Sequence, residues 1–133
     1  MRFVLALLIC LVPAAAAAAD WGRYENARFG YAAAIPPGFE GQGEAENGDG
    51  QVFRSRDGTQ LLRVYGGNLL DPDFEAAIGR AMGHAEEAGW ALSYERVTPS
   101  WASYSGTRNG MILYARAIVL CGGTQYASFE VEY

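Results

Sequence analysis

The sequence predicts an α+β protein in which one main helix packs on an antiparallel sheet of about six to seven strands. Met111–Leu120 carries a single charge, Arg116, and is apolar at both alternating sets of positions, which predicts a strand covered on both faces. Residues 74–88 repeat apolar side chains at helical spacing. Asp57–Gly58 and Asn109–Gly110 each separate two strand-like runs, which is typical of tight hairpins.

Met1–Ala19 is predicted to be a secretory signal peptide rather than part of the fold. A positively charged start precedes the apolar run Phe3–Val12, and Ala14–Ala19 supply the small residues that suit cleavage. The apolar run is too short for a membrane-spanning helix. We therefore expect cleavage near Ala19, a periplasmic or secreted location, no stable membrane span, and a single domain over residues 20–133.

Composition excludes several chemistries. All ten basic residues are arginines, so no lysine is present for a Schiff base or a phosphate-binding Walker motif. The formal net charge of −5 argues against nucleic acid as a partner. Cys10 leaves with the signal peptide, so Cys121 has no partner for an internal disulfide. Because Cys121 follows an apolar strand directly, we expect a buried, inert thiol, and intermolecular pairing is the alternative.

The first half of the chain predicts three strands. Apolar residues alternate over Gly30–Ile35, and the Pro36–Gly38 segment ends the run. Phe39–Gly50 is rich in glycine and acids and lacks apolar periodicity, so a surface loop is expected there. Gln51–Arg56 and Thr59–Tyr65 are the two strands of the first predicted hairpin.

The second half predicts the helix and four more strands. Asp71 is expected to cap the helix and Gly89 to end it. The four strands are expected at Ala91–Thr98, Trp101–Thr107, Met111–Leu120 and Thr124–Tyr133, which gives the order βββ-α-ββββ. A strand apolar on both sides needs two covering layers, and only one helix is found. Either loops cover the second face, or a second covering helix is missing at the C-terminus.

This order and several short motifs resemble the Mog1/PsbP-like fold. The opening segment Phe29–Phe39 is similar to that of the family, and Glu46–Gln51, Trp101–Gly110 and Cys121–Gly123 resemble markers of small exported bacterial proteins of unknown function. The resemblance covers most of residues 29–133. It implies a hairpin, a helix and an antiparallel meander, with a further helix after the last strand. Photosystem members of the fold are accessory proteins near a metal cluster, and no residue pattern here extends that role to this chain.

No catalytic residue and no cofactor are predicted. His84 is the only histidine, and Ser103 and Ser105 lie outside a nucleophile-elbow motif. A hydrolase with His84 as the base is therefore the least favoured hypothesis.

The acidic loop offers a candidate calcium site. Glu44, Glu46 and Asp49 could supply oxygen ligands, but the distant bidentate acid of a calcium loop is absent. The alternative is an acidic loop exposed to solvent.

Aromatic residues are the remaining signal for function. Trp90, Trp101 and Tyr104 are the candidate binding surface, because exposed aromatic side chains on one sheet face mark interfaces. The first hypothesis is a non-enzymatic accessory or protein-binding module with a partner in the cell envelope. The alternative is a module that binds a small molecule or cell-wall glycan in a cleft between sheet and helix. The oligomeric state is left open.

Overall fold

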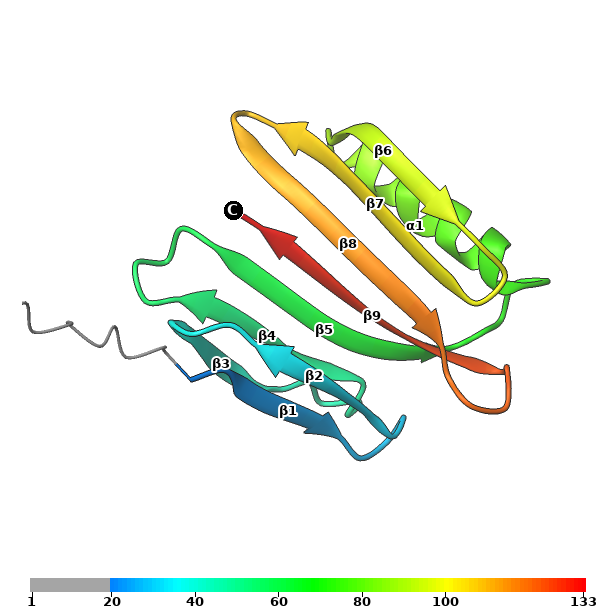
Figure 1. Ribbon diagram of the computed structural model, residues 1–133, viewed down its shortest axis with the longest axis horizontal. Coiled ribbons are helices and arrows are strands. Elements are labelled where there is room, and N and C mark those ends of the chain that lie inside the picture. The colour runs from blue at the N-terminus through cyan, green and yellow to red at the C-terminus, as the bar shows by residue number, and fades with distance from the viewer. Residues whose placement is uncertain (1–19) are drawn as a thin grey trace, which may run out of the picture.

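The computed structural model describes residues 20–133, and the predicted signal peptide lies outside the described residues. The described chain is mostly antiparallel sheet with one helix, so the α+β class is confirmed. The elements in chain order (Figure 1) are β1 (Gly22–Asn26), β2 (Tyr31–Ile35), β3 (Phe39–Glu44), β4 (Gly50–Ser55), β5 (Leu61–Asn68), α1 (Phe74–Glu87), β6 (Ala91–Val97), β7 (Trp101–Arg108), β8 (Met111–Val119) and β9 (Gln125–Glu132).

Seven strands form the main sheet in the order β3-β4-β5-β9-β8-β7-β6, and β1 and β2 form a separate hairpin. The last strand, β9, lies in the middle of the sheet, between β5 and β8 (Figure 1). The helix connects β5 to β6, so the chain crosses from the centre of the sheet to its far edge. The predicted antiparallel meander at the C-terminal end is therefore present, with β9 turned back against β5.

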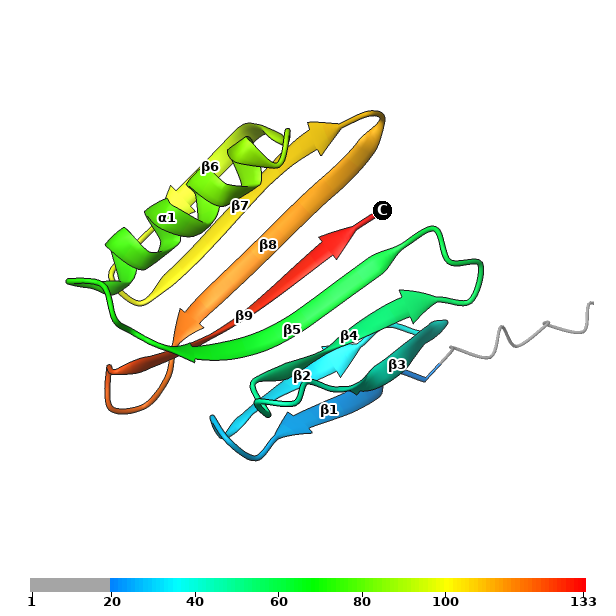
Figure 2. The same ribbon diagram turned by 180° about the vertical axis from the view of Figure 1, so that it is seen from behind.

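The helix and the hairpin cover opposite faces of the sheet, and they do so at opposite ends. In Figure 1 the hairpin lies in front of β3 and β4 while α1 lies behind β6 and β7, and Figure 2 shows the reverse. The alternation of side chains along each strand divides the buried residues accordingly. The core under the helix contains Phe74, Ile78, Trp90, Ala102, Tyr104, Leu113, Ala115 and Ala117. The core under the hairpin contains Phe29, Tyr31, Ile35, Phe53, Leu62, Val64 and Ala127.

The helix begins two residues later than predicted. Asp73, not Asp71, is the N-cap, and its carboxylate accepts a hydrogen bond from the backbone N–H of Ala76 at 2.8 Å. The predicted stop at Gly89 is confirmed, since Gly89 has a φ of +93° and its N–H donates to the Glu86 carbonyl. In the part of the chain that the structure describes, no helix has the length and apolar character needed to span a membrane.

One predicted hairpin turn is confirmed and the other differs. Asn109 and Gly110 have φ values of 51° and 79°, as a two-residue turn with left-handed positions requires. Between β4 and β5 the connection is longer, and only Gly58 has a positive φ. There the Asp57 carboxylate accepts hydrogen bonds from Ser55 and Thr59, so the side chain shapes the turn.

Two strands were not predicted. β1 lies before the first predicted strand, in a segment whose polar side chains, such as Arg23 and Glu25, are exposed to solvent. β3 occupies the first half of the predicted surface loop, so that prediction was wrong for Phe39–Glu44. β3 is an edge strand with an irregular register and mostly exposed side chains, which explains its missing apolar alternation.

The prediction that the Met111 strand is covered on both faces was wrong. Leu113 and its alternate neighbours are buried under the helix, but on the other face Ile112 is 39% and Ile118 is 44% exposed. The hairpin extends over the β3–β5 end of the sheet and leaves this half of the face open (Figure 1). The element that covers the second face is thus a hairpin in the described chain.

Cys121 is exposed, so the prediction of a buried thiol was also wrong. β8 ends at Val119, and Cys121 already belongs to the glycine-rich turn that leads to β9. The apolar strand before it gave no information about the turn itself.

Candidate ligand-binding cleft

An apolar cleft of about 470 Å³ lies between the β1–β2 hairpin and the main sheet. The strand β2 forms one wall, and β5, β9 and β8 form the floor. The lining residues are Trp21, Tyr31, Ala32, Ala33, Ala34, Pro36, Leu62, Val64, Arg116, Ile118, Ala127, Ser128, Phe129 and Val131. Arg116 is the one charged residue among them, so the cleft offers hydrophobic contact along most of its length.

The floor of the cleft is built from rows of residues that lie opposite each other on neighbouring strands. Val64 pairs with Phe129, and Phe129 pairs with Arg116 on its other side. Paired residues point to the same side of a sheet, so this row runs from the hairpin to the guanidinium of Arg116. A parallel row joins Ala127 to Ile118. The floor is therefore continuous and apolar up to β8.

The wall of the cleft is held open by small side chains between two anchors. Tyr31 and Ile35 at the two ends of β2 are buried against the sheet, and the three residues between them are alanines. Because an alanine fills little of the space that a larger side chain would occupy, the middle of β2 leaves the floor accessible. Trp21, which is 64% exposed, stands at the edge of the cleft.

Hydrogen bonds fix the hairpin against the main sheet. Asn26 is buried at the end of β1, and its amide nitrogen donates to the Gly48 carbonyl at 2.8 Å and to Glu44 at 3.1 Å. The hydroxyl of Tyr31 donates to the Asp49 carbonyl at 2.8 Å. Buried bonds of this kind hold the wall in one position, so the cleft exists before any ligand arrives.

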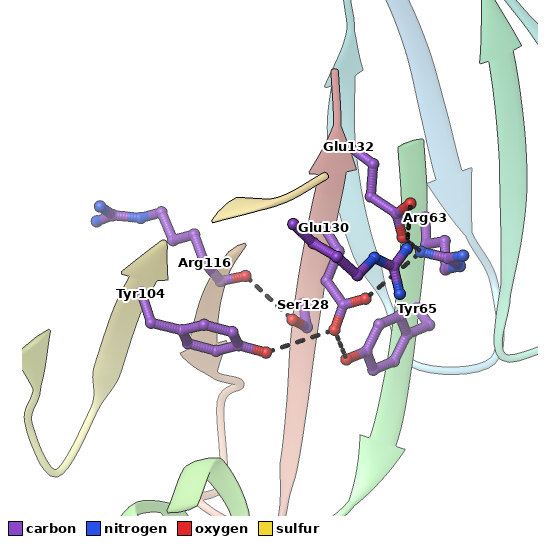
Figure 3. A network of polar contacts seen from close by, with 8 residues as sticks. Arg63, Tyr65, Tyr104, Arg116, Ser128, Glu130 and Glu132 are labelled. Carbon is purple, nitrogen blue, oxygen red and sulfur yellow. Dashed lines mark hydrogen bonds and ion pairs between the residues drawn. The ribbon is translucent and has the colours of Figure 1, made fainter. Parts of the chain in front are cut away.

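Arg116 is exposed at the β8 end of the cleft, and its side chain packs against an aromatic ring. Its guanidinium lies 5.1 Å from the ring centre of Trp101, and Arg96 lies on the same ring at 5.6 Å. Among residues 20–133, Arg116 forms no ion pair with a carboxylate. Figure 3 shows its side chain leading away from the acidic residues on the other face of the sheet.

The charged side chains on the opposite face of the sheet are paired with neighbouring side chains. Arg63 donates to Glu132 at 2.6 Å, and the Glu130 carboxylate accepts from the hydroxyls of Tyr65 and Tyr104 at 3.1 and 3.5 Å (Figure 3). Burial raises the pKa of both tyrosines, and the negative charge of Glu130 raises it further. Because every acid here already has partners, we interpret the cluster as structural.

His84 lies on the helix, beside a smaller cleft of about 290 Å³ that includes Arg63 and Glu132. Its imidazole is exposed and lies 3.3 Å from the Glu87 carboxylate. Ser103 is on the opposite face of the sheet, where its hydroxyl donates to the Tyr114 hydroxyl, and Ser105 shares that face. The structure therefore does not bring His84 together with these two serines.

The three residues of the predicted binding surface do not lie together. Trp90 and Tyr104 are only 6% and 4% exposed, because both are buried under the helix. Trp101 is on the other face and adjoins the apolar cleft through Arg116. The larger cleft is also not between sheet and helix, as expected, but between sheet and hairpin. The alanine run in β2 and the apolar positions Phe129 and Val131 in β9 were the signals that could have indicated it.

Two of the predicted calcium ligands, Glu44 and Asp49, form hydrogen bonds that stabilise the loop beneath the hairpin. Glu44 accepts hydrogen bonds from Tyr24 and Asn26, and Asp49 accepts one from Asn47. Glu46 is exposed and lies between them in the chain. Within residues 20–133, no three histidine, cysteine or acidic side chains are grouped so that they could hold a metal ion.

Residues 20–133 thus form an α+β fold with an apolar cleft between the hairpin and the main sheet. No model of a known protein family matches the chain, and neither does any curated protein.

Proposed function

We propose that this protein is an exported, non-enzymatic module that binds an apolar ligand in the cleft between the β1–β2 hairpin and the main sheet. The observation that carries the proposal is the cleft itself, about 470 Å³ in volume and lined almost wholly by hydrophobic residues. Clefts of a few hundred cubic ångströms with few polar groups are the usual form of small-molecule sites. The hydrogen-bonded anchoring of Asn26 and Tyr31 supports a preformed site.

Export is proposed from the sequence of the first nineteen residues, and the likeness to the Mog1/PsbP-like fold is proposed from the motifs given above. Export and the likeness to this fold both agree with a carrier or accessory role outside the cytoplasm. A protein that leaves the cell interior and has an open apolar cleft can hold a hydrophobic molecule that water alone would not carry.

A second candidate is a protein-binding module. The observation that favours it is the open half of the hairpin-side face, where Tyr94, Ile112 and Ile118 are exposed. A partner protein would cover these residues. It would not require the cleft beneath β2, and this difference separates the two candidates.

The cleft can be tested with the neutral fluorescent dye N-phenyl-1-naphthylamine. The dye should bind the mature protein with a rise in fluorescence, and Ala33→Phe should reduce its affinity about tenfold or more, because the new ring occupies the space between β2 and Phe129. Ala91→Phe is the matched control, since Ala91 is exposed on the edge strand β6 and does not line the cleft.

Equal dye affinity for Ala33→Phe and Ala91→Phe would contradict a site in this cleft. Absence of dye binding by the wild-type protein would overturn the apolar-ligand proposal and favour the protein-binding module. Melting temperatures of both variants establish that each is folded before the comparison is made.

A further inference from the structure

We infer that the ligand of this cleft is a single-chain amphiphile with a carboxylate head, such as a fatty acid, whose head group binds Arg116 and whose chain lies along the apolar floor. The inference rests on the proposed function and names its ligand class. Its elements are the position of Arg116, the absence of an ion-pair partner for it among residues 20–133, and the shape of the floor.

The charge of Arg116 distinguishes this end of the cleft from the rest of the site. Among residues 20–133, Arg116 is the only charged residue that lines the cleft, and it forms no ion pair. By contrast, Arg63 and Arg108 on the other face both lie within reach of Glu132. Arg96 adds a second positive charge 5.6 Å from the ring centre of Trp101. This end of the cleft therefore favours an anion, although the whole chain is acidic.

We infer a carboxylate head group from the hydrogen-bond donors of the Arg116 guanidinium. Its stacking on Trp101 restricts the guanidinium, and the free N–H groups form a planar fork that matches a carboxylate in bidentate fashion. A phosphate dianion calls for more than one cationic donor, and only one arginine reaches the cleft. A single guanidinium thus fits a monovalent head group.

The tail is a flexible hydrocarbon because of the shape of the floor. From Val64 through Phe129 to Arg116 the floor crosses two strand spacings, or about 10 Å. The row from Ala127 to Ile118 lies beside it and widens the apolar surface. A volume of about 470 Å³ is in the lower part of the range for small-molecule sites, which suits one chain rather than two.

The test compares decanoate with decanol, two probes with the same chain and different head groups, below their aggregation limits at pH 7.5. Affinities come from displacement of N-phenyl-1-naphthylamine and from calorimetry. Wild-type protein should bind decanoate about tenfold more tightly than decanol, and Arg116→Gln should reduce this preference to about twofold or less. Dye affinity should be unchanged in Arg116→Gln, because the apolar floor is intact.

Arg96→Gln is the matched control, because Arg96 stacks on the same tryptophan but does not line the cleft. It should keep the preference for decanoate. Arg116→Lys keeps the charge without the planar fork and should show a preference between those of wild type and Arg116→Gln. Because Arg116 is exposed, all three variants should keep the wild-type melting temperature.

Dye binding without any preference for decanoate would overturn the carboxylate inference and leave the apolar site in place. A preference that persists in Arg116→Gln, or one that Arg96→Gln removes equally, would also overturn it. If neither the dye nor decanoate binds wild-type protein, the proposed function fails together with the inference.

Discussion

The two faces of the main sheet differ in how their covering elements meet it. Under the helix, small strand residues such as Ala102 and Ala115 allow close approach, and the large side chains of Phe74 and Trp90 fill the remaining space. Under the hairpin the sizes are reversed, since the alanines are in β2 and the large residues are in the floor. A two-stranded layer is about 10 Å wide and cannot cover the strands beyond it. The helix side therefore has a closely packed core with only the smaller cleft beside it, and the hairpin side keeps the larger, apolar cleft.

The charged residues on the two faces of the sheet also differ in their partners. On the helix side, Arg63 forms ion pairs with Glu130 and Glu132, and Glu130 also accepts a hydrogen bond from Tyr65. On the hairpin side, Arg116 has an aromatic neighbour but no ion-pair partner in the part of the chain that the structure describes. Arg116 at the open end of the cleft thus differs from the paired charges on the helix side, and substitutions at the two places should have different consequences.

The largest effect is expected from Phe74→Ala on the helix side. Phe74 is buried at the start of α1, and removal of its ring leaves a cavity in the core that joins helix and sheet. We expect the free energy of unfolding to fall by about 3–5 kcal/mol, measured by urea denaturation. Ala76→Gly, on the exposed side of the same helix, should cost only about 1 kcal/mol. Similar losses in the two variants would show that the helix does not form a closed core.

The tyrosines of the charged cluster predict how stability depends on pH. Tyr65 and Tyr104 have pKa values raised above 10.0 by burial and by Glu130, so the folded state keeps both hydroxyls neutral where the unfolded state ionises. Their contribution to stability is therefore complete below pH 10 and is lost as the pH rises above it. The slope should reach up to about 1.4 kcal/mol per pH unit for each tyrosine.

The measurement is urea denaturation at pH values from 8 to 11. Tyr65→Phe removes one ionising group and should make the decline above pH 10 less steep. Tyr94→Phe, an exposed tyrosine on the opposite face, should leave the slope unchanged. An identical pH dependence in wild type and Tyr65→Phe would contradict the assignment of the cluster as a buried structural element.

The sequence predicted the elements whose side chains alternate against a core. β9 and α1 were predicted because one set of positions in each is apolar and the other is polar. β1 and β3 were missed because a strand at an edge, or one in a small hairpin, needs few apolar residues. The alanine run in β2 and the apolar positions of β9 indicate an apolar surface, but the location of the cleft depends on where the hairpin lies relative to the sheet. That placement is fixed by contacts such as Asn26 to Gly48, which are distant in the chain.

The apolar pattern of Met111–Val119 is a second case in which the sequence did not predict which residues are buried. Both sets of positions are apolar, and sequence reasoning assigned both to a core. In the structure only the set containing Ala115 is buried, while Ile118 is exposed at the floor of the cleft. An apolar residue retained at an exposed position is consistent with contact to a ligand as well as with packing. The pattern alone does not distinguish these two uses.

The smallest effect on stability is expected from Ile118→Ser, and it sharpens the comparison most directly. Ile118 and Ala117 are neighbours in β8 that point to opposite faces. Because Ile118 is 44% exposed, the serine variant should change the free energy of unfolding by about 0.5 kcal/mol or less, yet weaken dye binding severalfold through lost apolar contact. Ala117→Leu should do the opposite, since overpacking under the helix costs about 1–3 kcal/mol and leaves the cleft unaltered. If Ile118→Ser destabilises the protein as much as Ala117→Leu, Ile118 belongs to the buried core under the hairpin, and the distinction between that core and the open floor of the cleft is lost.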